Sequence, residues 1–282
     1  MVIIENLLTR AGLRTIIEKY GIQTRKKLGQ HFLVDGRVAD KIIVAAALTQ
    51  NDCVLEIGPG PGGLTQAMLP NVGHLIAVEL DTQLIPVLTN LFSDSNFTII
   101  QGDILKIDLH DALSTYTNKP IKVVANLPYY ITTPVIFYLL ESGLPFESIT
   151  VMVQKEVAKR MSASPSTKDY GSLTLAVQYY ADVSLVANVP VNCFMPRPAV
   201  DSAVVHMKIK HEPPVAVDKE RLFDVIHAAF NQRRKTLLNA LSSGLKMDKT
   251  YVFDILERSE IKADIRGETL DMAAFARIAK EL

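Results

Sequence analysis

Short, mainly apolar runs alternate with amphipathic segments over the first 210 residues of the chain. The runs predict strands at 53–57, 74–80, 96–101, 121–125 and 148–154. Apolar residues at helical spacing predict helices near 37–48, 64–69, 82–92 and 134–141. Strands that alternate with helices are joined by right-handed crossovers, so this order predicts a largely parallel sheet. Further strands at 183–189 and 203–209 flank a proline-rich turn and predict an antiparallel pair that closes the sheet.

The pattern changes at Glu212-Pro213-Pro214, which predicts a linker. Beyond it, apolar residues recur only at helical spacing, so we expect an all-helical tail. Three parts follow: an N-terminal basic segment at 1–36, a sheet domain at 37–212 and a helical domain at 213–282. Asp35 is placed to cap the helix predicted near 37–48. Pro86 stands about one turn inside the helix predicted at 82–92, where we expect mild strain.

Composition places the chain among globular proteins. Its 282 residues are 48 % hydrophobic and 21 % charged, which excludes disorder for the chain as a whole. Thirty basic and thirty acidic side chains cancel, so any site for a polyanion must be a local cluster. The candidates are Lys26 and Lys27 near the N-terminus and the run Arg233-Arg234-Lys235. Without context, a run of this kind is as readily a solvated helix face.

Several classes of protein fit the sequence poorly. Apolar runs stay far below the ~18 residues of a membrane span, and the N-terminus lacks the features of a signal peptide. The two cysteines, Cys53 and Cys193, make neither a disulfide framework nor a four-ligand zinc site. We therefore expect a cytoplasmic protein with no membrane or metal association.

A glycine-rich turn follows the first predicted strand. Gly58-Pro59-Gly60-Pro61-Gly62-Gly63 matches G-x-G-x-x-G, and Glu79 lies 21 residues beyond Gly58. In dinucleotide-binding folds an acidic residue at this spacing binds the ribose hydroxyls, while the glycines let the backbone approach the ligand. The turn alone does not separate a nicotinamide dinucleotide from other adenosine ligands, and a tight turn without a ligand remains an alternative.

Polar residues follow three of the predicted strands directly. Glu79, Asp103 and Asn126 would all fall on the carboxyl edge of a parallel sheet, where ligands bind in this fold class. Glu79 can accept both ribose hydroxyls, and Asp103 can accept from an exocyclic adenine amine. Taken singly, each acid has a simpler interpretation: Glu79 as a helix cap and Asp103 as the first residue of an Asx turn.

The segment Asn126-Leu127-Pro128-Tyr129 is the most specific feature of the chain. It resembles the Asp/Asn/Ser-Pro-Pro-Tyr/Phe/Trp type of motif in methyltransferases that act on amino groups of nucleic-acid bases. Adenine N6 is a poor nucleophile because its lone pair is delocalised into the ring. An amide oxygen and a backbone carbonyl that accept from N6–H localise that lone pair, and an aromatic side chain stacks on the extruded base. A surface turn is the alternative.

Four motifs together resemble the ribosomal RNA small-subunit adenine dimethyltransferases. They are Lys27–Leu33, Glu56–Gly60, Asn126–Tyr130 and Phe230–Leu237, and the resemblance runs from about residue 20 to the end. It implies a Rossmann-like class I methyltransferase sheet with a small helical C-terminal domain, and S-adenosyl-L-methionine as the methyl donor. The implied substrate is a pair of adjacent adenosines in a hairpin near the 3′ end of small-subunit (16S) rRNA. Each would become N6,N6-dimethyladenosine during ribosome biogenesis, by a monomer acting on an immature subunit.

The resemblance also implies roles for single residues. Cofactor contacts are expected from His31, Leu33, Gly58, Glu79, Asp103 and Asn126. The catalytic loop would be Asn126, Leu127, Pro128 and Tyr129, with Phe194 on the far side of the target base. RNA contacts are expected from Lys26, Lys27, Arg233, Arg234 and Lys235. His31 departs from the family pattern, where asparagine is common, and Phe194 is also interpretable as a core residue.

Three other functions are compatible with parts of the sequence. A nicotinamide-dependent dehydrogenase is compatible with the glycine turn but gives Asn126–Tyr129 no role. A large-subunit rRNA adenine methylase of the macrolide-resistance type shares the chemistry but usually lacks the Arg-Arg-Lys run in this form. A non-catalytic RNA-binding assembly factor on the same scaffold would not need the intact Glu79, Asp103 and Asn126.

Overall fold

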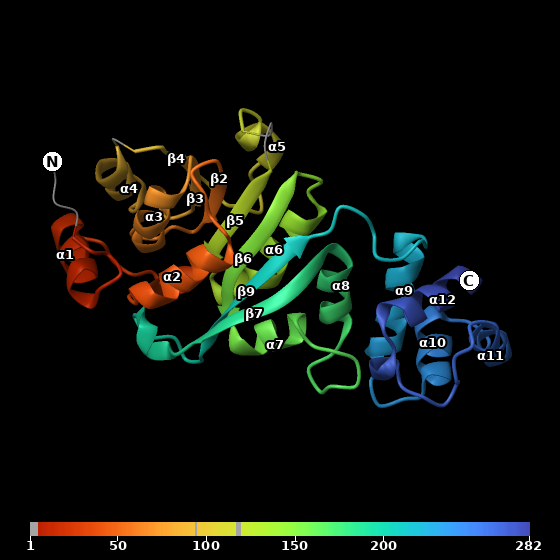
Figure 1. Ribbon diagram of the computed structural model, residues 1–282. Coiled ribbons are helices and arrows are strands. Elements are labelled where there is room, and N and C mark those ends of the chain that lie inside the picture. The colour runs from red at the N-terminus through yellow and green to blue at the C-terminus, as the bar shows by residue number, and fades with distance from the viewer. Residues whose placement is uncertain (1–4, 94, 117–119) are drawn as a thin grey trace. The chain divides into compact units, whose positions relative to one another are not determined.

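A computed structural model describes residues 5–93, 95–116 and 120–282. Within these residues the main element is a seven-stranded sheet with the strand order β4-β3-β2-β5-β6-β9-β7 (Figure 1). The strands are β2 (Cys53–Ile57), β3 (His74–Glu79), β4 (Phe97–Gln101), β5 (Ile121–Asn126), β6 (Phe146–Gln154), β7 (Ala181–Val189) and β9 (Ser202–Ile209). The first five pair in parallel, whereas β9 runs antiparallel to β6. The mostly parallel sheet predicted from the apolar runs is confirmed.

The register brings the predicted site residues to one edge. Ile57 at the end of β2 pairs with Val78 of β3 and with Ala125 of β5, so Glu79 and Asn126 flank the glycine turn that follows β2. The central strands β2, β3 and β5 are almost fully buried, as expected when helices cover both faces of a parallel sheet.

Helices connect these strands. They are α1 (Arg10–Tyr20), α2 (Gly36–Ala45), α3 (Gly63–Met68), α4 (Ile85–Phe92), α5 (Leu109–Leu113), α6 (Thr132–Glu141) and α7 (Lys155–Met161). The expected cap is confirmed, because the Asp35 side chain accepts from Arg37 N at the start of α2. The expected strain at Pro86 is wrong. Because α4 begins only at Ile85, Pro86 occupies the first turn, where its missing N–H costs no helical hydrogen bond.

The N-terminal segment packs onto the sheet domain. Leu7 and Ile16 share a core cluster with Leu84 and Leu88 of the α4 region. A two-stranded sheet within the described chain pairs β1 (Phe32–Leu33) with β8 (Phe194–Met195), with Leu33 opposite Phe194. The sequence pattern predicts neither strand, because two-residue strands are too short to show a period.

The described residues fall into two compact units: one lies within Met1–Ala158 and Ser184–Ile209, the other within Lys159–Val183 and Lys210–Leu282. The second unit holds α8 (Ser172–Tyr180), α9 (Lys219–Asn231), α10 (Leu237–Leu245), α11 (Lys249–Arg258) and α12 (Met272–Glu281). Tyr170 is buried in its core and donates through its hydroxyl to Leu270 O at 2.7 Å. Residues 159–183 therefore pack with the helical tail, a long-range association that the composition change near 213 does not reveal.

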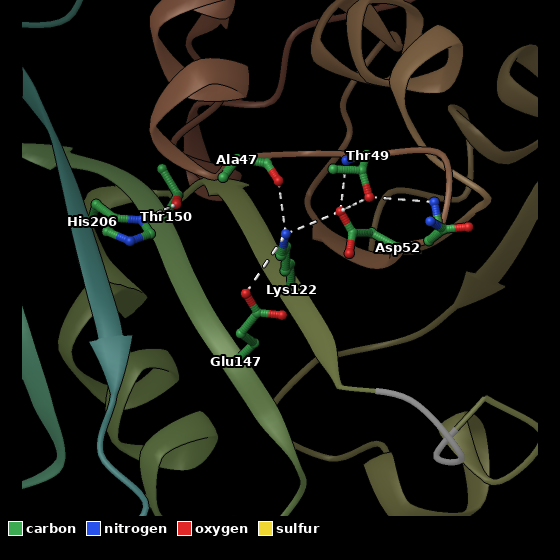
Figure 2. A network of polar contacts seen from close by, with 8 residues as sticks. Ala47, Thr49, Asp52, Lys122, Glu147, Thr150 and His206 are labelled. Carbon is green, nitrogen blue, oxygen red and sulfur yellow. Dashed lines mark hydrogen bonds and ion pairs between the residues drawn. The ribbon is translucent and has the colours of Figure 1, made fainter.

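The strand that carries Asn126 starts from an ionic network centred on the buried Lys122 (Figure 2). The ammonium group of Lys122, whose side chain is 6 % exposed, donates to Ala47 O at 2.7 Å and to Asp52 Oδ2 at 3.0 Å. Glu147 Oε1 lies 3.7 Å from the same nitrogen. Asp52 Oδ2 also accepts from the backbone and hydroxyl of Thr49, at 2.6 and 3.0 Å. The network joins the end of the α2 region to Asp52, just before β2, and to the first residues of β5 and β6.

Across the described residues, none of the helices has both the length and the apolar character needed to cross a membrane.

Candidate active site

A pocket opens at the carboxyl edge of the sheet. Its walls come from the turn after β2, the ends of β3 and β5, the loop after β4 and the N-terminal residues 28–33. All six residues expected to contact a cofactor line it: His31, Leu33, Gly58, Glu79, Asp103 and Asn126. Four of the five expected catalytic residues line it as well, namely Asn126, Leu127, Pro128 and Tyr129.

The glycine turn brings bare backbone to the pocket. Gly58 has φ +68°, a left-handed conformation that disfavours any side chain, and a Cβ at this position would meet nothing within 4 Å. The turn therefore leaves an open cradle in front of Gly58. Gly60, at φ +60°, serves packing instead, because a Cβ there would lie 3.0 Å from the ring of Phe32.

Glu79 is buried at the end of β3, yet its carboxylate is well bonded. Oε2 accepts from Gly60 N at 3.1 Å and Oε1 accepts from Asp81 N at 2.7 Å. Burial raises the pKa of Glu79 to about 7, against the lowering effect of these backbone bonds. Glu79 is therefore a pocket carboxylate whose charge changes near neutral pH.

A second buried carboxylate, Glu56 on β2, lines the same pocket. Its Oε2 accepts from the Thr65 hydroxyl at 2.6 Å. Burial raises the pKa of Glu56 to about 8, with a further upward contribution from the nearby Glu79. In the sequence Glu56 is singled out only as part of a motif; the signal that could have marked it on its own is an acid in the middle of an otherwise apolar strand.

The amide of Asn126 is held in one orientation. Its Nδ2 donates to His31 O at 2.9 Å, which requires the amide nitrogen to face that carbonyl. Oδ1 then faces the other way, and no described residue donates to it. The structure thus presents at the pocket an amide oxygen that can accept a hydrogen bond.

Tyr129 follows on a short 3₁₀ turn, Tyr129–Ile131. Its hydroxyl shares a hydrogen bond of 2.7 Å with Ser202 Oγ, and its ring stacks against the imidazole of His31 at 5.8 Å between centroids. His31 Nδ1 lies 2.9 Å from Pro196 O. The position of the Tyr129 side chain is therefore fixed by Ser202 at its hydroxyl and by His31 on one face of its ring. The neighbouring Tyr130 also lines the pocket but is 56 % exposed.

Phe194 is not brought to the pocket. Its side chain is 1 % exposed and belongs to the core cluster that contains Leu33, Val38 and Ala39. The reason is the pairing of β8 with β1, which turns the ring into the core behind the N-terminal segment. In this arrangement Phe194 supports the pocket wall, and the stacking role expected for it stays a prediction.

Asp103 stands at the start of the loop after β4. Its Oδ1 accepts from Leu105 N at 3.1 Å, so the Asx-turn interpretation is correct for one oxygen. Oδ2 lies 3.8 Å from Lys106 Nζ, and the side chain is 31 % exposed. A residue can fill both roles, because the turn uses only one oxygen, and Asp103 lines the pocket.

The expected RNA-binding residues lie in different surroundings. Lys27 is exposed, and the side chain of Lys26 lies outside the described residues. Arg233, Arg234 and Lys235 stand after the end of α9, on a turn and not on a helix face. Arg233 Nε donates to Glu268 Oε2 at 2.8 Å, and its Nη2 donates to Lys168 O at 2.6 Å. Arg234 and Lys235 are exposed.

No group of three or more His, Cys, Asp or Glu side chains in the described part of the chain is arranged to hold a metal ion.

Known proteins resemble this chain along almost its whole length. The family model described as ribosomal RNA adenine dimethylase matches residues 21–277. A protein of Lachnoclostridium phytofermentans named ribosomal RNA small subunit methyltransferase A is 50 % identical over 270 residues, covering 94 % of this chain and 93 % of that protein. A protein of the same name from Alkaliphilus metalliredigens is 43 % identical over 282 residues, covering 99 % and 98 %.

Among solved structures, a dimethyladenosine transferase from Plasmodium falciparum superposes with a TM-score of 0.76 at 28 % identity. The superposition covers 88 % of this chain and 96 % of that one.

Proposed function

The chain belongs to the ribosomal RNA adenine dimethylase family, and we infer that it is an S-adenosylmethionine-dependent enzyme that dimethylates N6 of two adjacent adenosines near the 3′ end of small-subunit rRNA. The observation that carries this inference is the meeting of Glu79, Asp103, Asn126 and Tyr129 in one pocket. The large-subunit and non-catalytic alternatives are not favoured, because relatives at 43–50 % identity carry the small-subunit name along almost their whole length.

The pocket fits S-adenosylmethionine by the chemistry of its donors and acceptors. The Glu79 carboxylate is suited to two ribose hydroxyls, Asp103 to an exocyclic amine, and the open cradle at Gly58 to the methionine part. His31 and Leu33 close the side formed by the N-terminal segment. The cofactor supplies an electrophilic methyl group; the residues around it bind it, orient it and exclude water.

The loop after β5 is proposed to prepare the target amine. Asn126 Oδ1 and the Leu127 carbonyl would each accept from N6–H, which localises the nitrogen lone pair toward the methyl group. Pro128 restricts the loop, and Ile131 N donates to its carbonyl at 3.2 Å, so the acceptors are held before the base arrives. Tyr129, fixed by Ser202 and His31, would stack on the extruded adenine.

We propose further that the enzyme acts as a cytoplasmic monomer on an immature small subunit. The helical unit and the basic turn at Lys27 are the proposed RNA-binding parts. The decisive test is a methyl-transfer assay on small subunits that lack the modification, with mass spectrometry of the rRNA. Product other than N6,N6-dimethyladenosine, or activity only on large subunits, would overturn the proposal.

Replacing Glu79 by alanine is expected to weaken cofactor binding by about 1.5–3 kcal/mol, the scale of hydrogen bonds to a charged group. This corresponds to roughly 10–100-fold in the dissociation constant. Titration calorimetry with S-adenosylmethionine measures it, and Glu18→Ala on the exposed face of α1 is the matched control. An unchanged constant in Glu79→Ala would refute the ribose role.

The same carboxylate predicts a pH dependence. Because the pKa of Glu79 is raised to about 7, its charged fraction falls as pH drops through that value. The charged form accepts both hydroxyls, so wild-type affinity is expected to fall up to about tenfold between pH 8 and pH 6. The neighbouring acids are Glu56 and Asp81. Glu79→Gln should bind weakly and lose the dependence of about tenfold that comes from Glu79, so that any remaining change between pH 8 and pH 6 belongs to Glu56.

The exposed residues Arg234 and Lys235, on the turn after α9, give a prediction about the salt dependence of RNA binding. Arg234→Ala with Lys235→Ala is expected to weaken binding to unmodified small subunits and to lower the salt slope by about 0.7–0.9 for each phosphate that the variant no longer neutralises. Arg233→Ala should instead destabilise the helical unit, because it breaks the bonds to Glu268 and Lys168. Binding titrations at several salt concentrations, paired with melting curves, separate the two effects. Lys262→Ala is the exposed control, and an unchanged slope in the double variant would exclude phosphate binding by this turn.

A further inference from the structure

Asp81, two residues beyond Glu79, is a buried carboxylate that the proposed chemistry does not use. Its side chain is fully inaccessible and both of its oxygens have partners. Oδ2 accepts from Gln30 Nε2 at 2.8 Å, Oδ1 accepts from Gln83 N at 3.1 Å, and Arg25 Nη1 lies 3.3 Å from Oδ1. Two of these partners belong to the N-terminal segment, about fifty positions away in the sequence. Asp81 therefore ties that segment to the end of β3.

The backbone of Asp81 reaches the cofactor pocket at the same time. Its N–H donates to Glu79 Oε1 at 2.7 Å, so Asp81 also orients the carboxylate proposed to hold the ribose. Gln30 Oε1 in turn accepts from Arg25 N at 2.7 Å. The Gln83 amide satisfies its neighbours when its oxygen faces Arg25, at 2.7 Å from Nε. Arg25 is thus committed to this network, although it belongs to the basic run that includes Lys27.

The part of the N-terminal segment between α1 and α2 has little regular structure. Between α1 and α2 it holds only the 3₁₀ turn Lys26–Leu28 and the two residues of β1. Yet residues 28–33 line the pocket, and the carbonyl of His31 fixes the amide of Asn126 at 2.9 Å. This segment therefore sets the position of a proposed catalytic amide, and Gln30, which is bonded to Asp81, is the residue next to His31.

We propose that Asp81 is a positioning residue that couples cofactor binding to rRNA binding, by tying the basic turn at Arg25–Lys27 and the carboxylate of Glu79 into one hydrogen-bonded assembly. The inference rests on the proposed function. A cofactor that occupies the pocket contacts Glu79 and the wall at 28–33, so it stabilises the docked position of the segment. Lys27 is then presented to the RNA from a fixed place. By linkage, bound RNA tightens cofactor binding by the same factor.

The test measures that factor directly. The dissociation constant for unmodified small subunits is determined with and without saturating S-adenosylhomocysteine, for the wild type and for Asp81→Asn. We expect the ligand to tighten wild-type binding about fivefold or more, and the ratio in Asp81→Asn to approach one. The matched control is Asp108→Asn, since Asp108 caps α5 through His110 N and Asp111 N and, among the described residues, makes no bond to the N-terminal segment. Its ratio should stay at the wild-type value.

A second readout follows the segment itself. Trypsin cleavage after Arg25 and Lys27 should be slowed by S-adenosylhomocysteine in the wild type and not in Asp81→Asn. Gln30→Leu removes the bond to Asp81 from a half-buried position, so it tests the same link should Asp81→Asn fold poorly. The inference alone is overturned if S-adenosylhomocysteine leaves the binding of wild-type enzyme to small subunits unchanged. It is also overturned if both variants keep the tightening of subunit binding and the protection from trypsin that the wild type shows. Failure of the wild type to bind S-adenosylhomocysteine would overturn the proposed function with it.

Discussion

Alanine at position 126 is expected to lower kcat by a factor of about 10²–10³ while the protein remains folded, the scale of losing one acceptor aimed at charge that develops in the transition state. The structure sharpens this expectation, because the bond from Asn126 Nδ2 to the His31 carbonyl leaves Oδ1 facing the pocket. Alanine removes the oxygen together with the bond that fixed it. Single-turnover methyl transfer to unmodified small subunits measures the chemical step without interference from product release.

The chain offers a matched control at the other edge of the sheet. Asn96, just before β4, donates through Nδ2 to Val72 O and Gly73 O at 2.7 and 2.8 Å. Asn96→Ala therefore also loses side-chain bonds to backbone carbonyls, and we expect lower stability with kcat close to wild type. If Asn126→Ala folds and keeps kcat within a few-fold of the wild type, the Asn126–Tyr129 segment is only a turn.

Replacing Lys122 by alanine is expected to cost about 3 kcal/mol of stability in the sheet unit, the lower end of the range for breaking a buried ion pair by removing one partner. The loss comes from what remains: Asp52 keeps its bonds to Thr49 but loses its counter-charge, and Ala47 O loses its donor. Lys122→Met keeps the apolar stem of the side chain but also lacks the ammonium group, so we expect it to be destabilised nearly as much as Lys122→Ala. Hydrogen exchange of the β5 amides, read by mass spectrometry, reports the opening free energy of this strand.

Arg37→Ala is the surface counterpart. Arg37 pairs with Asp35 at 2.8 Å, but its side chain is 88 % exposed, and exposed pairs add little because water and salt screen them. We expect β5 exchange in this variant to match the wild type. Equal exchange in Lys122→Ala and the wild type would mean that water or a shifted side chain replaces the ammonium group, and that the network is dispensable.

The mostly parallel sheet and the placing of the pocket residues at its carboxyl edge are predicted from the sequence alone, whereas the order of the strands is not. Mainly apolar runs such as Ile121–Ala125, interrupted by Lys122, and Cys53–Ile57, interrupted by Glu56, are buried on both faces, and parallel strands bring their carboxyl ends to the same edge. Glu79, Asp103 and Asn126, which stand at or just after the ends of such strands, therefore line one pocket. The glycine turn is equally local, because the left-handed φ values at Gly58 and Gly60 are encoded by residue type.

The tertiary structure decided what depends on contacts between distant segments. Phe194 faces the core because β8 pairs with β1, and residues 159–183 join the helical unit because Tyr170 is buried among its helices. Arg233 forms an ion pair with Glu268, a partner 35 residues away that the basic run in the sequence does not indicate. The partners of Asp81 are Gln30 and Arg25, which lie some fifty residues away in the sequence and contact it only in the folded protein. Local patterns encode which backbone a residue prefers, whereas the partner of a buried charge is set by the packing of the whole unit.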